Sequence, residues 1–354
     1  MKIGFLLSTF IVASISFAQK QVFTKSITKN FEVNPQTNFS LINFNGDINV
    51  ELWTKNEIEI NVVYEVNTVK YKKSDIYLQA FSLLINKDSA NNLRVESLID
   101  KKYLDNSFNN GPSYYKINYH LKIPVYLNIS LRNKYGNIHL PELSGFVSVK
   151  LSYGKLIVTN LTADESKQMP LFDLRYASMT VNKANWLNVD ADYSVIKVKE
   201  TKAISISSSY SNITIDDVYS ATLKSRYDKI DFGNISKLNI NMNYSKLNIK
   251  FLKSDLQCFA KYSPFTIHDL YENFSDIWLD LHYSDVTVYV NRLACFNVNT
   301  DIDYGKIFLP KRSNVNNYIT PTSFKTNGTI GCISGATVNF IAKAKYCDIS
   351  IIER

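Results

Sequence analysis

The stretch LNVDADYSVIKVKETKAISISSSYSNITIDDVYSATLKSRYDKIDF, residues 187–232, repeats one short pattern around Tyr193, Tyr210 and Tyr227, which are 17 residues apart. Apolar residues alternate with polar ones up to each tyrosine, and this period of two is typical of a strand with one buried face. The apolar residues resume three and five positions after the tyrosine, so the alternation changes phase there. Each repeat therefore predicts a strand, a corner just after the tyrosine, a second short strand and a polar turn.

The same pattern extends over most of the chain. The copies centre on Tyr135, Tyr153, Tyr176, Tyr193, Tyr210, Tyr227, Tyr244, Tyr262, Tyr283, Tyr304 and Tyr346. Successive copies are 17 to 23 residues apart, except for a final gap of 42 that a degenerate copy around Asn327 divides into 23 and 19. A period near twenty residues indicates a solenoid. We expect an all-β, single-stranded parallel β-solenoid with rungs of about 17–23 residues, and the bias of parallel crossovers predicts a right-handed coil.

The repeated tyrosines have two interpretations. Stacked on one another at the strand spacing of about 4.8 Å, they would form a ladder that stiffens the rod. Alternatively, they would form an aromatic track that grips carbohydrate or a partner peptide. Tyr193 shares the parity of Leu187 and Val189, which favours a ladder on the core side of the strand. The residue after each tyrosine is Gly, Ala, Ser, Asp or Cys, and such small or turn-prone residues suit a tight corner.

The chain before the regular repeats is β-rich but less periodic. We expect residues 19–130 to form an N-terminal cap with the first irregular rungs, and residues 131–354 to form the tyrosine-ladder solenoid. A cap is needed because the open end of a solenoid exposes unpaired strand edges.

The first residues have the plan of a secretory signal peptide. Lys2 precedes an apolar run, and Ser16 and Ala18 provide the small residues of a cleavage site, so residues 1–18 are expected to be removed. No later stretch has the roughly 20 apolar residues of a membrane span. The mature chain is therefore expected to be exported to the periplasm, the outer cell surface or the medium. The 40 Lys and Arg residues exceed the 32 Asp and Glu residues but are scattered, which does not favour a nucleic-acid partner.

The motif G-D-I-N-V-x-x-W-x-x-x-E-I-x-I, from Gly46 to Ile60, precedes many copies of [YN]-[GS]-x-I-x-[VI]. Together these motifs make the chain resemble the putative-adhesin family of exported bacterial proteins. The copies at Tyr135, Tyr153, Tyr304 and Asn327 keep the glycine that this family often has after the aromatic or amide residue. The resemblance covers nearly the whole mature chain and implies a β-solenoid at the cell envelope. It supplies no catalytic residues.

Two sets of side chains are candidates for further chemistry. Export permits disulfides, but the spacing of the cysteines does not select a pairing over buried free thiols; they are Cys258, Cys295, Cys332 and Cys347. On consecutive repeats, Asp280 and Asp301 share one offset from the tyrosine, and His282 and Asp303 share another. If these repeats form adjacent rungs, the four side chains lie in a square that could hold a divalent cation or act as a carboxylate pair on sugars.

No catalytic or cofactor-binding motif is present: the chain has no nucleophile elbow, P-loop, dinucleotide fingerprint or HExxH helix. We therefore expect a non-enzymatic envelope or cell-surface protein, an adhesin or scaffold, with a glycan or an envelope or surface protein as partner and no cofactor. One alternative is a polysaccharide-active β-helix enzyme, although rungs of 17 or 18 residues leave no loops to wall a groove. Another alternative is an envelope-stress or regulatory binding protein.

Overall fold

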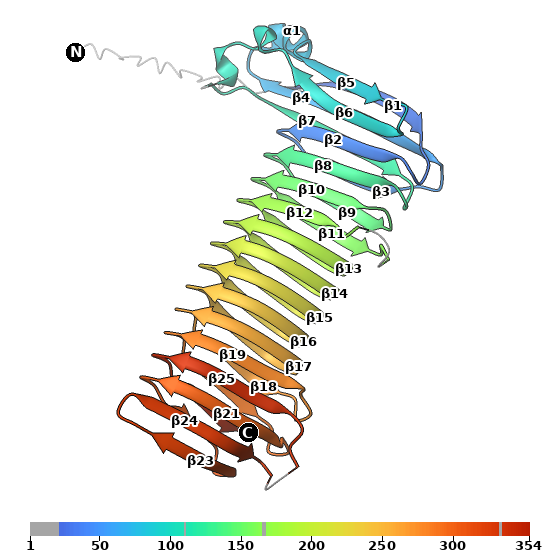
Figure 1. Cartoon of the computed structure of the whole chain (residues 1–354). Coiled ribbons are helices and arrows are strands. Elements are labelled where there is room, and N and C mark those ends of the chain that lie inside the picture. The colour runs from blue at the N-terminus through green and yellow to red at the C-terminus, as the bar shows by residue number, and fades with distance from the viewer. Residues whose placement is uncertain (1–20, 110, 165–167, 333–334) are drawn as a thin grey trace, which may run out of the picture.

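The structure is a computed structural model that describes residues 21–109, 111–164, 168–332 and 335–354. The signal peptide expected at residues 1–18 lies outside the described residues. The described chain forms a long β-solenoid with a β-rich cap at its N-terminal end and a hairpin at the other end (Figure 1). The predicted fold class is confirmed.

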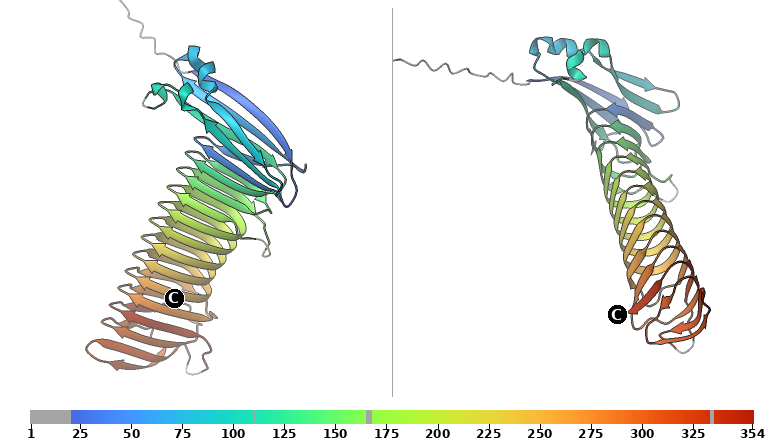
Figure 2. Two further views of the ribbon diagram at one scale, coloured as in Figure 1. Left: turned by 45° about the horizontal axis from the view of Figure 1, so that its top comes forward. Right: turned by 90° about the vertical axis from the view of Figure 1, so that its left-hand side faces the viewer.

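Each rung contributes one strand before its corner residue and one strand after it, and the two sets stack into two sheets that we name sheet 1 and sheet 2. Both sheets are seen in the two further views (Figure 2). The spatial order in sheet 1 is β2 (Asn38–Phe44), β8 (Asn128–Lys134), β10 (Val147–Ser152), β12 (Leu171–Arg175), the second halves of β13 (Ser178–Asp192), β14 (Val195–Ser209), β15 (Asn212–Arg226), β16 (Lys229–Asn243) and β17 (Lys246–Lys261), then β19 (Asp276–His282), β25 (Asn339–Lys345) and β21 (Phe296–Asp303).

Sheet 2 stacks in the same sequence of rungs. Its spatial order is β3 (Ile48–Leu52), β9 (Ile138–Leu143), β11 (Lys155–Leu161), the first halves of β13 to β17, then β18 (Phe265–Leu270), β20 (Val286–Val290), β26 (Ile349–Glu353) and β22 (Ile307–Phe308). All of these neighbours are parallel. The inward residues of both sheets, mostly Ile, Leu and Val, form one continuous apolar core along the rod, and burying them is the main source of stability.

The N-terminal cap extends each sheet first by one parallel strand and then by antiparallel strands. In sheet 1, β6 (Asn92–Ile99) pairs with β2, and β5 (Phe81–Lys87) pairs with β6; in sheet 2, β7 (Tyr114–Ile123) pairs with β3, followed by β4 (Glu57–Thr68) and β1 (Gln21–Glu32). The cap also holds helix α1 (Ser74–Leu78) and the short 3₁₀ turns η1 (Tyr71–Lys73), η2 (Lys101–Tyr103) and η3 (Asn106–Phe108). The first rung of the rod is thus β2–β3, whose corner is Asn45 with a φ of 63°.

The C-terminal rungs do not follow chain order. After β19–β20 the chain skips one rung position, forms β21–β22, and then builds the antiparallel hairpin β23 (Ser313–Ile319) and β24 (Ser323–Ile330) on β21. It then returns, and β25–β26 fills the vacant position between β19–β20 and β21–β22. The expected rung at Asn327 is wrong, because Asn327 lies within the antiparallel hairpin, opposite Asn299 and Asn316.

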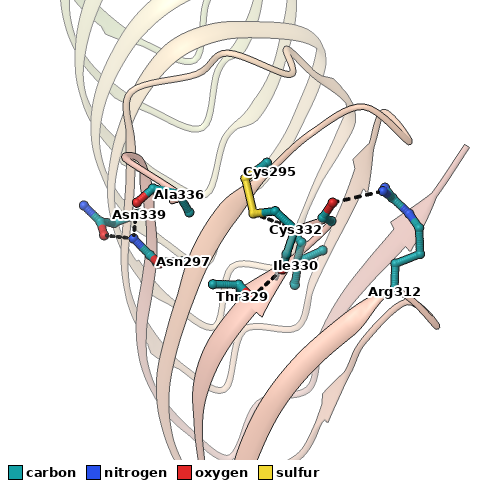
Figure 3. The surroundings of a disulfide bond; sticks show 9 residues. Cys295, Asn297, Arg312, Thr329, Ile330, Cys332, Ala336 and Asn339 are labelled. Atoms are coloured by element: carbon teal, nitrogen blue, oxygen red, sulfur yellow. Dashed lines mark hydrogen bonds between the residues drawn. A yellow bond between two sulfur atoms is a disulfide. The ribbon is translucent and has the colours of Figure 1, made fainter. Parts of the chain in front are cut away.

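A disulfide fixes this C-terminal arrangement. Cys295, just before β21, is bonded to Cys332, just after β24, with a Cα–Cα distance of 5.4 Å (Figure 3). Near it, the Asn297 side chain donates to the Ala336 carbonyl at 3.2 Å and so holds the returning chain. The other two cysteines, Cys258 and Cys347, are buried free thiols. The sequence left all of these pairings open.

The cysteines give a first testable prediction. The oxidised, folded protein is expected to show almost no reaction with a thiol reagent, because burial covers Cys258 and Cys347 and raises the pKa of both thiols. Titration in denaturant should reveal two thiols without a reductant and four after reduction. Four thiols without a reductant would contradict the disulfide, and rapid labelling of the folded protein would contradict the burial.

Candidate binding face

The corner tyrosines form a single file along one edge of the rod. All eleven have positive φ, between 49° and 61°, and consecutive rings stack with centroids 4.7–5.1 Å apart and interplanar angles of at most 20°. The file follows the spatial order of the rungs, so Tyr346 lies between Tyr283 and Tyr304. Phe44 of the first rung extends the file by an edge contact with Tyr135. The predicted ladder is therefore present.

The expected core-side position of these tyrosines is wrong. Their side chains are 38–55% exposed, so the file runs along the outside of the corner. A left-handed backbone conformation at Tyr193 interrupts the extended geometry, and the inward position passes from Ala191 to Ser194. The ring faces cover one another, and mainly ring edges and hydroxyl groups reach solvent. A sugar ring needs an open aromatic face, so this file is a poor carbohydrate track.

The residue after each tyrosine points inward and forms a second column, which we call the corner column. Its hydroxyl groups accept the backbone N–H of the preceding rung and donate to a carbonyl of their own rung. Ser263 Oγ, for example, accepts from Ser245 N at 2.9 Å and donates to Lys261 O at 2.8 Å. Cys347 fills the same role with its sulfur, which accepts from Ser284 N at 3.1 Å. These buried contacts satisfy polar groups at the corner, which explains the small residues there.

Glycine takes this position on the rungs nearest the N-terminal cap for a steric reason. A Cβ on Gly136 would lie 1.8 Å from the carbonyl oxygen of Gly46 on the neighbouring rung. No side chain fits so close to a backbone oxygen. Gly154 and Gly305 are limited in the same way, because a Cβ on either would lie 2.0 Å from a carbonyl oxygen of the neighbouring rung.

The expected square of Asp280, His282, Asp301 and Asp303 is wrong in its premise, because the two repeats are not on adjacent rungs. Lys343 lies in register between Asp280 and Asp301, and Lys345 lies between His282 and Asp303. Asp301 instead pairs with Lys325 of the hairpin at 2.8 Å, and His282 lies 3.6 Å from Asp280. Within the described ranges, no group of three or more His, Cys, Asp or Glu side chains is placed to hold a metal ion.

A different set of side chains stands out on sheet 1. Phe259 and Trp278 occupy outward positions on adjacent rungs, with ring centroids 4.8 Å apart and planes tilted by 58°. Phe259 is 37% exposed, and Ile341 lies opposite Trp278 on the next rung. We name Phe259, Trp278 and Ile341 the aromatic patch. Unlike the stacked tyrosines, these two rings are tilted and do not cover each other completely.

Polar groups border the aromatic patch on its N-terminal side. Asn239 donates to Gln257 Oε1 at 3.1 Å, and Lys237 lies 3.4 Å from the carboxylate of Asp255. Together with Asp276 and Trp278, these residues line a shallow depression on the sheet. Amide and carboxylate groups beside a ring are the usual composition of a small-ligand site.

The sequence analysis did not identify this patch, although the sequence carries a signal for it. Phe259 lies three residues before Tyr262, an offset at which other rungs place Ser207 and Asn241. Trp278 lies five residues before Tyr283, an offset at which other rungs place Ser205 and Asn239. A large aromatic residue at an outward offset is the deviation that would have indicated the site.

Comparisons with known proteins give limited information. No protein-family model and no curated protein matches the chain. Among solved structures, a "putative cell adhesion protein" from Clostridium sporogenes ATCC 15579 aligns at 12% identity over 94% of this chain and 100% of its own, with a TM-score of 0.20. A "putative adhesin" from Bacteroides fragilis NCTC 9343 aligns at 11% identity over 93% and 97%, with a TM-score of 0.29. A "Putative lipid binding protein" from Parabacteroides distasonis ATCC 8503 aligns at 9% identity over 92% and 96%, with a TM-score of 0.30.

The described helices include none that is long and apolar enough to cross a membrane.

Proposed function

We propose that this chain is an exported, non-enzymatic binding scaffold of the cell envelope or cell surface, and that the aromatic patch of sheet 1 binds a glycan. The observation that carries the proposal is the pair of tilted, partly exposed rings of Phe259 and Trp278 on the mostly polar outer face of sheet 1. An aromatic pair at an outward position gains little for the fold and leaves apolar surface in water, so a ligand-binding role accounts for it better.

The chemistry of the patch fits a sugar. The apolar C–H face of a pyranose ring can pack on an aromatic ring, and its hydroxyl groups can pair with nearby amides and carboxylates. Asn239, Gln257 and Asp255 supply such groups within one or two rungs of Trp278. A shallow site on a rigid sheet suits one segment of a polymer better than an enclosed small molecule.

The proposal of export draws support from the cysteines. A disulfide between Cys295 and Cys332 forms and persists in an oxidising compartment and is rare in the cytosol. This agrees with the signal peptide expected at residues 1–18. The periplasm, the outer cell surface and the medium are all oxidising environments of this kind.

The test is binding of the purified mature chain to immobilised glycans of bacterial and host type. Trp278→Ala and Phe259→Ala are each expected to weaken the strongest binding by about tenfold or more, because a buried aromatic contact is worth at least about 1–2 kcal/mol. Tyr219→Ala is the matched control, since Tyr219 is 59% exposed and lies outside the patch.

The aromatic patch would be rejected as the binding site if Tyr219→Ala weakened glycan binding as much as Trp278→Ala, or if Trp278→Ala did not weaken it. If the chain binds an envelope or surface protein and no glycan, the proposed ligand changes from a glycan to a protein. Release of reducing sugar from a polysaccharide panel would replace the non-enzymatic proposal with the enzyme alternative.

A further inference from the structure

The hairpin at the C-terminal end leaves one strand edge unpaired. In the described part of the chain, β23 pairs only with β24, so its other edge presents free backbone N–H and C=O groups over seven residues (Figure 1). The hairpin ends sheet 1, and no described strand continues it. Such an edge is a template for an added strand.

The edges at the other end of the rod are protected. Strand β1 carries lysines along its free edge, and Lys25 Nζ donates to the Phe81 carbonyl of β5 at 3.2 Å. Lys87, at the end of β5, donates to the Glu32 carbonyl of β1 at 3.4 Å. Lysine on an edge strand is a common means of preventing edge-to-edge pairing, because a second chain would have to bury the charge.

Strand β23 has no such protection. Its sequence SNVNNYI contains no charged residue, and Tyr318 and Ile319 are 66% and 63% exposed. Phe308 of β22 is 52% exposed and lines a cleft with Ile319 and Phe324 beside the hairpin turn. An uncharged edge and a group of exposed apolar side chains therefore occur together at the same end of the rod.

We infer that β23 pairs in antiparallel fashion with β23 of a second copy of this chain, which joins two rods at their C-terminal ends. A twofold axis at Asn316 places all seven residues opposite one another: Asn316 faces its own copy, Val315 faces Asn317, and Asn314 faces Tyr318. Sheet 1 becomes continuous across the axis, and the exposed Tyr318 and Ile319 lie beside Asn314 and Ser313 of the second copy.

Two features favour a second copy over a foreign strand. Pairing around a twofold axis satisfies the free β23 edges of both chains at once and leaves no edge of β23 for further growth. Because β23 carries no charged residue, two copies of it can pair without repulsion between like charges. For the same reason, β23 offers no opposite charge that would attract a charged strand of another protein. Arg312, next to the strand, is already paired with Glu353 at 2.6 Å.

The first test is analytical ultracentrifugation of the mature chain, with its disulfide intact, over a range of concentrations. A concentration-dependent dimer is expected. Asn316→Lys places two like charges on the axis and should shift the protein to the monomer value. The matched control is Asn241→Lys, an exposed outward position in the middle of sheet 1, which should leave the dimer intact. Trp278→Ala should also remain a dimer, because the aromatic patch lies away from the axis.

A second test does not depend on losing the dimer. Asn316→Cys brings two cysteines together across the axis, where Cα atoms of opposed residues lie about 4.5–5.5 Å apart, within the range of a disulfide. Mild oxidation should give a covalent dimer, and Asn241→Cys should not. Each of three results would overturn the inference. The first is a monomer at every concentration, and the second is a failure of Asn316→Cys to cross-link. The third is an Asn316→Lys variant that keeps the wild-type melting temperature and still forms the dimer.

Discussion

Removal of residues 339–354 is expected to detach the whole C-terminal module from the rod. The strands β21 and β22 pair with the rest of the solenoid only through β25 and β26, although Phe296 of β21 also packs on Phe274, and β24 and β23 are carried on β21. Without the β25–β26 rung, residues 295–332 keep their hairpin and disulfide but lose the strand pairing that links them to β19 and β20. The exposed edges of β19 and β20 should in addition promote aggregation.

Hydrogen exchange measures this effect region by region. Backbone amides of residues 296–308 should lose most of their protection, and those of the rungs between residues 128 and 261 should keep it. The control is the double variant Lys343→Ser and Lys345→Ser, which changes only exposed outward side chains of β25. Full protection of β21 in the truncated chain would contradict the prediction, since it would mean that β21 docks directly on β19.

The second large effect concerns Asp228, the only acidic residue in the corner column of the described rungs. Asp228 is 5% exposed, and its carboxylate accepts hydrogen bonds from Ser208 Oγ at 2.6 Å, Ser225 Oγ at 2.7 Å, Ser211 N at 2.7 Å and Arg226 N at 3.2 Å. Asp228→Ala leaves Ser208 Oγ and Ser211 N without this acceptor, whereas Ser225 Oγ keeps a hydrogen bond to Ser245 Oγ at 2.9 Å. Each such loss costs about 1–3 kcal/mol and the losses are not additive, so we expect destabilisation by about 3–5 kcal/mol.

The matched variant is Asp228→Ser, because serine occupies this position on the neighbouring rungs at Ser211 and Ser245. Its hydroxyl group can still accept from Ser211 N, so its cost should be about 1–2 kcal/mol. Urea unfolding, followed by far-ultraviolet circular dichroism, compares the two. Equal stability of the alanine and serine variants would show that the carboxylate contributes nothing beyond the corner hydrogen bond.

The rungs were predictable from the sequence because the pattern is local. Apolar alternation, a small residue at the corner and a nearly constant period are all present in residues 187–232, and any of these rungs can be identified without its neighbours. The first rung carries the same signal: Asn45-Gly46-Asp47-Ile48 fits the repeat, with asparagine at the position of positive φ. Asparagine adopts that conformation more readily than most residues.

Counting alternate residues along the strand did not predict the direction in which the tyrosine side chains point. Period-two alternation holds only while the backbone stays extended, and one residue in the left-handed region shifts the phase. The sequence places the phase change near the corner but does not say which residue takes the unusual conformation. Tyr193 and its equivalents take it, and not the residues just after each tyrosine, where the apolar spacing had predicted the corner.

The order of the rungs was beyond the sequence for another reason. Because the repeats are so similar, the sequence does not show whether the β21 or the β25 repeat follows β19 in the stack. What separates them is the hairpin and the disulfide between Cys295 and Cys332, which are long-range features. The error propagated to the candidate site, since the square of Asp280, His282, Asp301 and Asp303 required the simpler order.

The 17-residue rungs between Tyr176 and Tyr244 have one further consequence, for how a protein of this kind can change in size. Each of them offers its neighbours the same strand register on both sides. Duplicating or deleting one such unit would therefore lengthen or shorten the molecule by about 4.8 Å and leave both ends as they are. The distance between the cap and the terminal hairpin becomes a quantity that evolution, or an engineer, can set in discrete steps.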